Sequence, residues 1–167
     1  VEYIINTHGH TDHINGNARS RQVTGARVAA FKDAMHSTDI AIADNNRVMV
    51  GNVKLDFFHV PGHANDHIVI WLPDQRIAIT GDILFVGKIG RTSSEKDART
   101  EWNSLHLLLN KLPDDATIWP GHDYGCRPSS SIALEKLCNP FLQCKSIHEF
   151  LHLKAEWTEY KIKHGLK

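Results

Sequence analysis

Residues 4–13 constrain the fold more than any other part of the chain, because they read IINTHGHTDH. An apolar, β-branched run that ends in Asn-Thr predicts a buried strand with a loop at its C-terminal end. Burying three imidazoles and a carboxylate there without partners would cost several kcal/mol. A divalent cation removes that cost, since neutral imidazoles and carboxylates are its ligands. We therefore predict a metal-binding loop and set aside the alternative of a His-rich surface loop.

The composition indicates one globular domain, spanning residues 1–167, in which residues 142–167 form a C-terminal helical tail. Hydrophobic residues make up 41% and charged residues 23% of the chain, which is typical of soluble proteins. The formal net charge is zero, so nothing in it favours nucleic acid or an anionic membrane as a partner. No apolar run approaches the length of a membrane span. We expect a small-molecule substrate.

The three cysteines, Cys126, Cys138 and Cys144, are odd in number and lack C-x-x-C spacing. We predict free thiols in a reducing, cytoplasmic compartment, with one disulfide in an extracellular protein as the alternative. The chain has no initiator Met and begins inside a predicted strand, so we expect an upstream segment that would hold any targeting peptide. Without such a segment, exposed strand edges would favour a homo-oligomer.

Predicted strands and turn signals alternate along most of the chain. The expected elements are a helix over 15–22, strands over 26–31, 47–50, 53–60, 67–72, 76–80 and 116–119, and an amphipathic helix over 146–163. Ser94 and Asp97 form a capping-box pattern before a helix whose apolar spacing runs from Trp102 to Leu112. Residues 32–46 are polar and irregular.

Potential metal ligands recur where these strands end, beside Gly or Pro-Gly. His63 follows Pro-Gly, Asp82 follows Gly, and His122 follows Pro-Gly. Strand ends at one edge of a sheet converge, and Gly lets the backbone turn tightly beside a ligand. The sequence therefore predicts one cleft that holds His8, His10, Asp12, His13, His63, Asp82 and His122.

The ordered motifs HGHTDH (8–13), PGH (61–63), TGD (80–82) and PGH (120–122) resemble the signature of the metallo-β-lactamase superfamily. Within it, the chain is most similar to the glyoxalase II and persulfide dioxygenase branches, from residue 1 to about Phe141. The resemblance implies an α/β (α+β) fold, the αββα sandwich of two mixed sheets covered by helices. This chain looks like that sandwich without its N-terminal strands.

The resemblance also implies two adjoining metal positions, most readily for zinc, with iron or manganese as alternatives. The first position would use His8, His10 and His63, the second Asp12, His13 and His122, and Asp82 would bridge them. With two metal ions bound, the protein would act as a hydrolase of the glyoxalase II type. A metal-bridging hydroxide, oriented by Asp12, would attack the carbonyl of a thioester such as a hydroxyacylglutathione.

Persulfide dioxygenases of the same superfamily use the same residue types for another reaction. There the counterparts of His8, His63 and Asp82 bind one iron and leave positions open for O₂ and a glutathione persulfide. Ligand spacing does not separate this alternative from the hydrolase. A third class, a metal-binding module without catalysis, is disfavoured because all seven ligands are present.

The resemblance gives Arg91 and Tyr124 as substrate-binding residues. Gly90-Arg91-Thr92 looks more like the dioxygenase branch, whereas His122-Asp123-Tyr124 resembles the glyoxalase II segment whose Tyr contacts glutathione. The basic C-terminal residues that complete the glutathione site in glyoxalase II have no clear match in the tail.

Three further signals are interpreted as structural. HEFLH (148–152) spells H-E-x-x-H but lacks a third ligand, so we assign it to a packing helix. We expect the hairpin after His63 to carry His67 away from the metals. We expect Trp119 to pack beneath the site and Cys126 to be a passive thiol.

Overall fold

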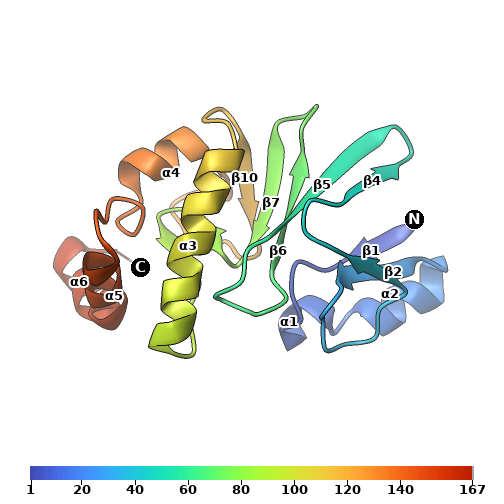
Figure 1. Cartoon of the computed structure of the whole chain (residues 1–167), viewed down its shortest axis with the longest axis horizontal. Helices are drawn as coiled ribbons and strands as arrows, with labels where there is room; N and C mark the ends of the chain where they lie inside the picture. The colour runs from blue at the N-terminus through green and yellow to red at the C-terminus, as the bar shows by residue number, and fades with distance from the viewer. Residues whose placement is uncertain (167) are drawn as a thin grey trace.

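A computed structural model describes residues 1–166 as two main sheets and one two-stranded hairpin, flanked by helices (Figure 1). The smaller sheet is parallel, in the order β1 (Tyr3–Ile5), β2 (Arg27–Phe31), β3 (Ile40–Ile42). Helices α1 (Thr11–Ile14) and α2 (Asn17–Thr24) connect its first two strands, and α2 ends at Gly25 with φ of 71°. The predicted strand–loop–helix–strand unit is confirmed. Strand β3 lies in the stretch expected to be irregular, because three residues are too few for a readable pattern.

The larger sheet has the order β11-β10-β7-β6-β5-β4. Its strands are β4 (Arg47–Val50), β5 (Val53–His59), β6 (Ile68–Leu72), β7 (Ile77–Gly81), β10 (Thr117–Pro120) and β11 (Ser130–Ser131). The antiparallel pairs β4/β5 and β6/β7 confirm both predicted hairpins, and β10 adds parallel to β7. A short hairpin, β8 (Leu84–Phe85) and β9 (Lys88–Ile89), follows β7.

Four helices lie on the far side of this sheet from β1–β3 (Figure 1). They are α3 (Glu95–Lys111), α4 (Ile132–Cys138), α5 (Ile147–Ala155) and α6 (Trp157–His164). The Ser94 hydroxyl accepts a hydrogen bond from the Asp97 backbone N–H, which confirms the predicted cap of α3. The single helix expected over 146–163 is instead two helices that break at Glu156. Within residues 1–166, none of the helices combines the length and apolar character needed to cross a membrane.

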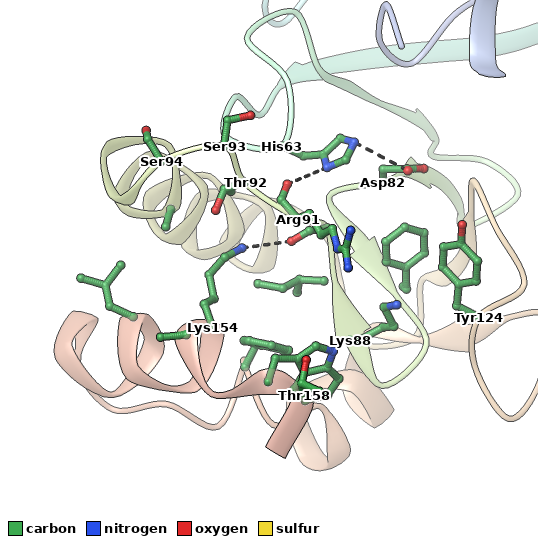
Figure 2. Close-up of a pocket in the computed structure, with 18 of the residues that line it drawn as sticks. His63, Asp82, Lys88, Arg91, Thr92, Ser93, Ser94, Tyr124, Lys154 and Thr158 are labelled. Carbon is green, nitrogen blue, oxygen red and sulfur yellow. Dashed lines mark hydrogen bonds and ion pairs between the residues drawn. The ribbon is translucent and has the colours of Figure 1, made fainter. Parts of the chain in front are cut away.

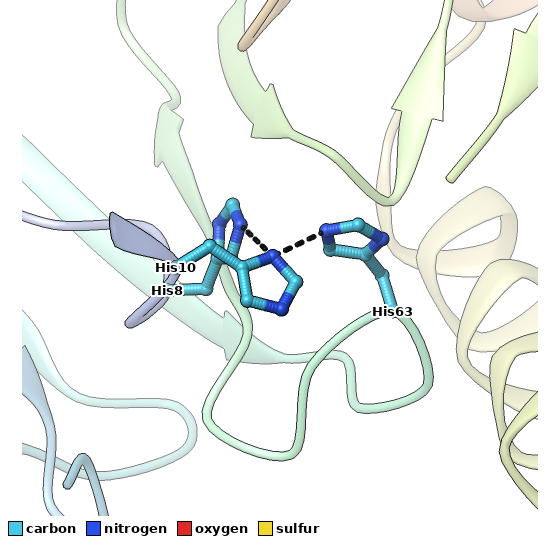
Figure 3. Close-up of side chains that lie close together, drawn as sticks. All are labelled: His8, His10 and His63. Carbon is cyan, nitrogen blue, oxygen red and sulfur yellow. Dashed lines mark hydrogen bonds between the residues drawn. The ribbon is translucent and has the colours of Figure 1, made fainter. Parts of the chain in front are cut away.

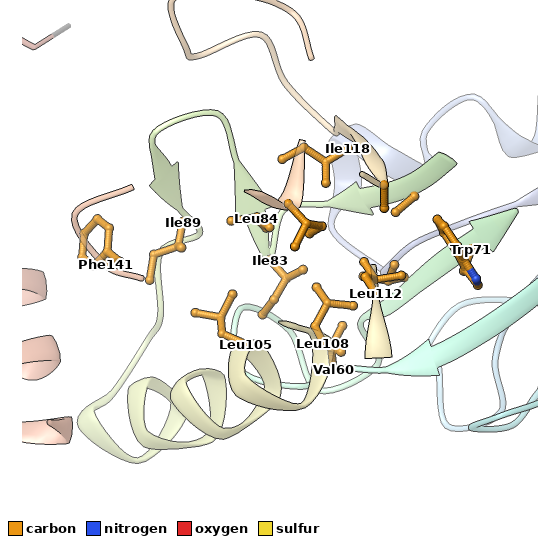
Figure 4. Close-up of a cluster of buried hydrophobic side chains, with 14 of the residues drawn as sticks. Val60, Trp71, Ile83, Leu84, Ile89, Leu105, Leu108, Leu112, Ile118 and Phe141 are labelled. Atoms are coloured by element: carbon orange, nitrogen blue, oxygen red, sulfur yellow. The ribbon is translucent and has the colours of Figure 1, made fainter. Parts of the chain in front are cut away.

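Strand β6 is buried on both faces and therefore joins two cores. Ile68 and Ile70 pack with Phe57 and the small sheet. Val69 and Trp71 face the opposite way, into a core with Ile83, Leu84, Leu105 and Leu108, beneath α3 (Figure 4). This layering is the sandwich that the resemblance implied.

The sheets bring four loops to one place. Strands β5, β7 and β10 run in the same direction, so their C-terminal ends lie at one edge of the larger sheet. The loop after β1 is attached to that sheet by a hydrogen bond of 2.8 Å from the Ile68 N–H to the Thr7 carbonyl. The edge formed in this way carries the candidate ligands.

Replacing Leu108 by Ala should lower the free energy of unfolding by about 2–5 kcal/mol, because its fully buried side chain would leave a cavity under the sheet. Leu137→Ala is the control, since Leu137 is 73% exposed and its loss should change stability by less than about 0.5 kcal/mol. Urea unfolding measures both. Equal effects of the two substitutions would contradict the assigned core.

Candidate metal centre

The first cluster of nitrogen donors comes from the loops after β1 and β5 (Figure 3). His10 Nδ1 lies 3.0 Å from His8 Nε2 and 3.0 Å from His63 Nε2. His8 is buried, whereas His10 is exposed at the rim. All three nitrogens lie within 4.8 Å of one another, which is close enough to share one ion.

The second cluster joins α1 to the loop after β10. His122 Nε2 lies 3.2 Å from His13 Nε2 and 3.3 Å from the Asp12 carboxylate. These three side chains also converge within 4.8 Å. His13 and His122 are 109 residues apart in the sequence, and the pairing of β10 with β7 helps to bring them together.

Asp82 stands between the two clusters, directly after β7. Its carboxylate oxygens lie 3.4 Å from His13 Nε2, 3.6 Å from His63 Nε2 and 3.4 Å from His122 Nε2. The structure therefore brings together all seven side chains that the sequence predicted to share a cleft.

The contacts within this cluster fit a divalent cation better than hydrogen bonding. His10 Nδ1 faces two ring nitrogens, yet one nitrogen carries either a single proton or a single lone pair. Within residues 1–166, the buried Asp82 Oδ1 has no hydrogen-bond donor. A buried carboxylate without a partner is costly, and a cation would offset that cost. Imidazole and carboxylate donors in this number suit zinc, iron or manganese.

Burial prepares the imidazoles to act as ligands. Burial lowers the pKa of His8, and neighbouring histidines lower it further. Burial also lowers the pKa of His63. Both rings are therefore neutral at pH 7, which is the form that binds a metal.

Hydrogen bonds from the surrounding chain orient these rings. His63 Nδ1 lies 2.8 Å from the Arg91 carbonyl oxygen, which can only accept, so Nδ1 carries the proton and the Nε2 lone pair faces the cluster. His8 Nδ1 lies 3.1 Å from the Thr7 hydroxyl. Such partners of metal ligands fix the tautomer and the ring orientation.

His67 lies beside the candidate ligands, so the expectation that its hairpin carries it away is wrong. Its ring is fully buried and stacks on His8 with centroids 4.9 Å apart. His67 Nε2 accepts a hydrogen bond of 3.0 Å from the Asp82 N–H. Sequence spacing missed this role because β6 begins only at Ile68, so His67 still belongs to the loop that faces the site.

Glycines make room for this geometry. A Cβ at Gly121 would lie 2.3 Å from Asp82 Oδ1, and one at Gly62 would lie 2.4 Å from the Cβ of Glu101 on α3. Gly62 also has φ of 142°, a conformation that other residues rarely adopt. Gly62 therefore lets the loop that carries His63 pack against α3, and Gly121 lets the loop that carries His122 approach Asp82.

The chain matches the family described as the metallo-beta-lactamase superfamily over residues 1–39 and 44–122. The chain belongs to the metallo-β-lactamase superfamily. Members of this superfamily bind metal ions, in agreement with the clusters described above.

Its relatives include two kinds of enzyme. The chain is 37% identical over 124 residues to a hydroxyacylglutathione hydrolase of Methylobacterium sp. (strain 4-46), covering 72% of this chain and 48% of the relative. It is 32% identical over 153 residues to the mitochondrial persulfide dioxygenase ETHE1 of Homo sapiens, covering 90% of this chain and 60% of the relative. The chain thus spans about half to three fifths of the length of these relatives.

Among solved structures, ETHE1 from Myxococcus xanthus superposes with a TM-score of 0.84 at 33% identity. The match covers 93% of this chain and 69% of that chain. The fold of the superfamily is therefore present over most of the chain.

In this metallo-β-lactamase domain, a pocket of about 880 Å³ opens beside the candidate ligands (Figure 2). Arg91 and Tyr124 both line it, and the Tyr124 ring stacks on His122 with centroids 4.9 Å apart. Lys154 of α5 and Lys161 of α6 line it too. The tail therefore brings basic residues to the pocket, which motif comparison had missed because helix packing, not a local pattern, places them there.

The residues that the sequence assigned to structural roles lie outside the metal clusters. His148 and His152 of the H-E-x-x-H pattern are exposed on α5, and His152 pairs with Glu156 at 3.4 Å. Neither belongs to a metal-capable cluster in the described part of the chain. Trp119 is 46% exposed, so the expectation that it packs beneath the site is wrong. The three cysteines are free, as predicted.

His63→Ala should greatly reduce the metal content of the purified protein, because His63 contributes a nitrogen to the first cluster and approaches Asp82. His148→Ala is the matched control, since it removes an exposed imidazole from α5. Elemental analysis after equal exposure to zinc compares the two. Undiminished metal in His63→Ala would contradict the assigned centre.

Proposed function

We propose that the chain carries a two-metal hydrolase centre that cleaves a thioester of the hydroxyacylglutathione type. The observation that carries this proposal is the completeness of the second cluster. His122 Nε2 lies within 3.2–3.4 Å of His13, Asp12 and Asp82. A single ion held by His8, His63 and Asp82 would leave Asp12, His13 and His122 clustered without an ion to bind. The identity of 37% to a hydroxyacylglutathione hydrolase adds support.

When bound, the two ions would supply Lewis acidity to the carbonyl and lower the pKa of water. The chain itself contributes Asp12, whose exposed carboxylate lies at the pocket. Asp12 would accept a hydrogen bond from the attacking water and so orient it. In the overall reaction the water oxygen bonds to the acyl carbon, the carbon–sulfur bond breaks, and a proton passes to the sulfur.

Unpaired positive charges support an anionic substrate. Lys88, Arg91 and Lys161 line the pocket, and none of them forms a salt bridge within residues 1–166. Burial lowers the pKa of Lys88, and Lys161 and Arg91 lower it further. The Lys88 ammonium lies 4.5 Å above the Tyr124 ring. Carboxylates on the thiol part of a substrate would neutralise this group of cations.

Lys88→Met should raise KM for a glutathione thioester about tenfold with little change in kcat, because the contact it removes is made equally before and during the reaction. Lys111→Met is a matched control. Lys111 also lies 4.5 Å above an aromatic ring, that of Phe58, but does not line the pocket. Steady-state kinetics distinguish them, and an unchanged KM in Lys88→Met would refute the substrate assignment.

A mononuclear iron persulfide dioxygenase is the second candidate. The similarity to ETHE1 from Myxococcus xanthus, which covers 93% of this chain at 33% identity, favours it. So does the segment Gly90-Arg91-Thr92, which lines the pocket and resembles the dioxygenase branch. Its iron would use His8, His63 and Asp82, a pattern of two histidines and one carboxylate.

Metal analysis together with two assays separates the candidates. We expect two zinc ions per chain and release of free thiol from S-lactoylglutathione. One iron per chain, with O₂ consumed in the presence of glutathione persulfide, would overturn the hydrolase in favour of the dioxygenase.

A further inference from the structure

An ion pair with one fully buried member lies between α3 and α5, next to the candidate centre. Glu101, on α3, has no exposed surface, and its carboxylate accepts a hydrogen bond from the Lys154 ammonium. The same ammonium donates a second hydrogen bond, of 3.0 Å, to the Gly90 carbonyl. Figure 2 shows Lys154 reaching from α5 to the backbone beside Arg91.

The Gly90–Arg91 segment that Lys154 holds is itself in contact with two candidate ligands. The Arg91 carbonyl accepts the Nδ1 proton of His63 at 2.8 Å. A Cβ at Gly90 would lie 2.2 Å from the Asp82 carbonyl oxygen and 2.7 Å from His63 Nδ1. Movement of this segment would therefore change the orientation of the His63 ring.

Packing alone does not explain the choice of charged residues here. Taking two charges out of water is costly, and apolar residues of similar volume are often as stable. Glu101 Oε1 has no hydrogen-bond partner in the described chain, and burial raises the pKa of Glu101 to about 7 although Lys154 opposes this. The Lys154 side chain is only 13% exposed, and its ammonium donates to two acceptors, so it is not free to bind substrate.

We propose that Glu101 and Lys154 are positioning residues that hold the Gly90–Arg91 segment against His63 and so aim His63 Nε2 into the metal centre. Glu101 fixes the Lys154 ammonium, the ammonium fixes the Gly90 carbonyl, and the adjoining Arg91 carbonyl fixes the ring. In this way helix α5, in the C-terminal part of the chain, is coupled to metal binding. The inference rests on the proposed role of His63 as a ligand.

The test uses variants that separate positioning from stability. Lys154→Met leaves Glu101 buried without its partner, so instability could mask its effect on the site. The double variant Glu101→Leu/Lys154→Met removes both charges and should unfold at the same urea concentration as the wild type. Lys154→Arg retains donors for both acceptors. Lys136→Met is the control, because it breaks a salt bridge of 2.6 Å to Asp114 on the exposed surface.

Zinc affinity, measured by competition with a chromophoric chelator, should fall at least about tenfold in the double variant. It should recover in Lys154→Arg and stay unchanged in Lys136→Met. Wild-type zinc affinity in a double variant of wild-type stability would overturn the proposal.

A second readout needs no metal. In metal-free protein labelled with ¹⁵N-histidine, the Nδ1 proton of His63 should exchange with solvent faster in the double variant than in the wild type. If the wild type bound no metal, the proposed function would fail, and this exchange rate would still decide the positioning role. An unchanged rate would overturn it.

Discussion

The buried carboxylate of Asp82 is the group on which the arrangement of the site depends. It lies 3.4–3.6 Å from the imidazoles of His13, His63 and His122, and its Oδ1 has no hydrogen-bond donor in the described chain. Such a group is costly to bury unless positive charge or hydrogen bonds compensate it. Metal ions on either side would meet this requirement. The parallel direction of β5, β7 and β10 matters because it delivers the compensating ligands to the same edge.

Around these ligands, a layer of backbone and polar side-chain groups orients His8, His63 and Asp82. The Arg91 carbonyl fixes His63, and His67 accepts from the Asp82 N–H. Part of this support, Glu101 of α3 and Lys154 of α5, is far from the ligands in sequence. The C-terminal helices therefore contribute both to the pocket, through Lys161, and to the support of the centre, through Lys154.

The ligand cluster was readable from the sequence because its members come soon after strands and most of them sit beside Gly. A strand pattern and a Gly are local signals, and parallel strand ends meet by geometry alone. The supporting residues were not readable. Glu101 looks like any polar residue of a helix, and only the packing of α5 on α3 shows that it is buried beside Lys154. The position of His67 was predicted wrongly because β6 begins one residue after it, so His67 stays in the loop that faces the site. The position of Trp119 was predicted wrongly because its side chain on β10 is exposed to solvent.

The claim that two metal positions share Asp82 is tested most directly by anomalous diffraction from metal-loaded crystals, recorded at the zinc and iron edges. The account predicts two peaks about 3.5–4 Å apart, with Asp82 between them. One peak near His8, His10 and His63 would contradict it if the side chains of Asp12, His13 and His122 had no ion among them.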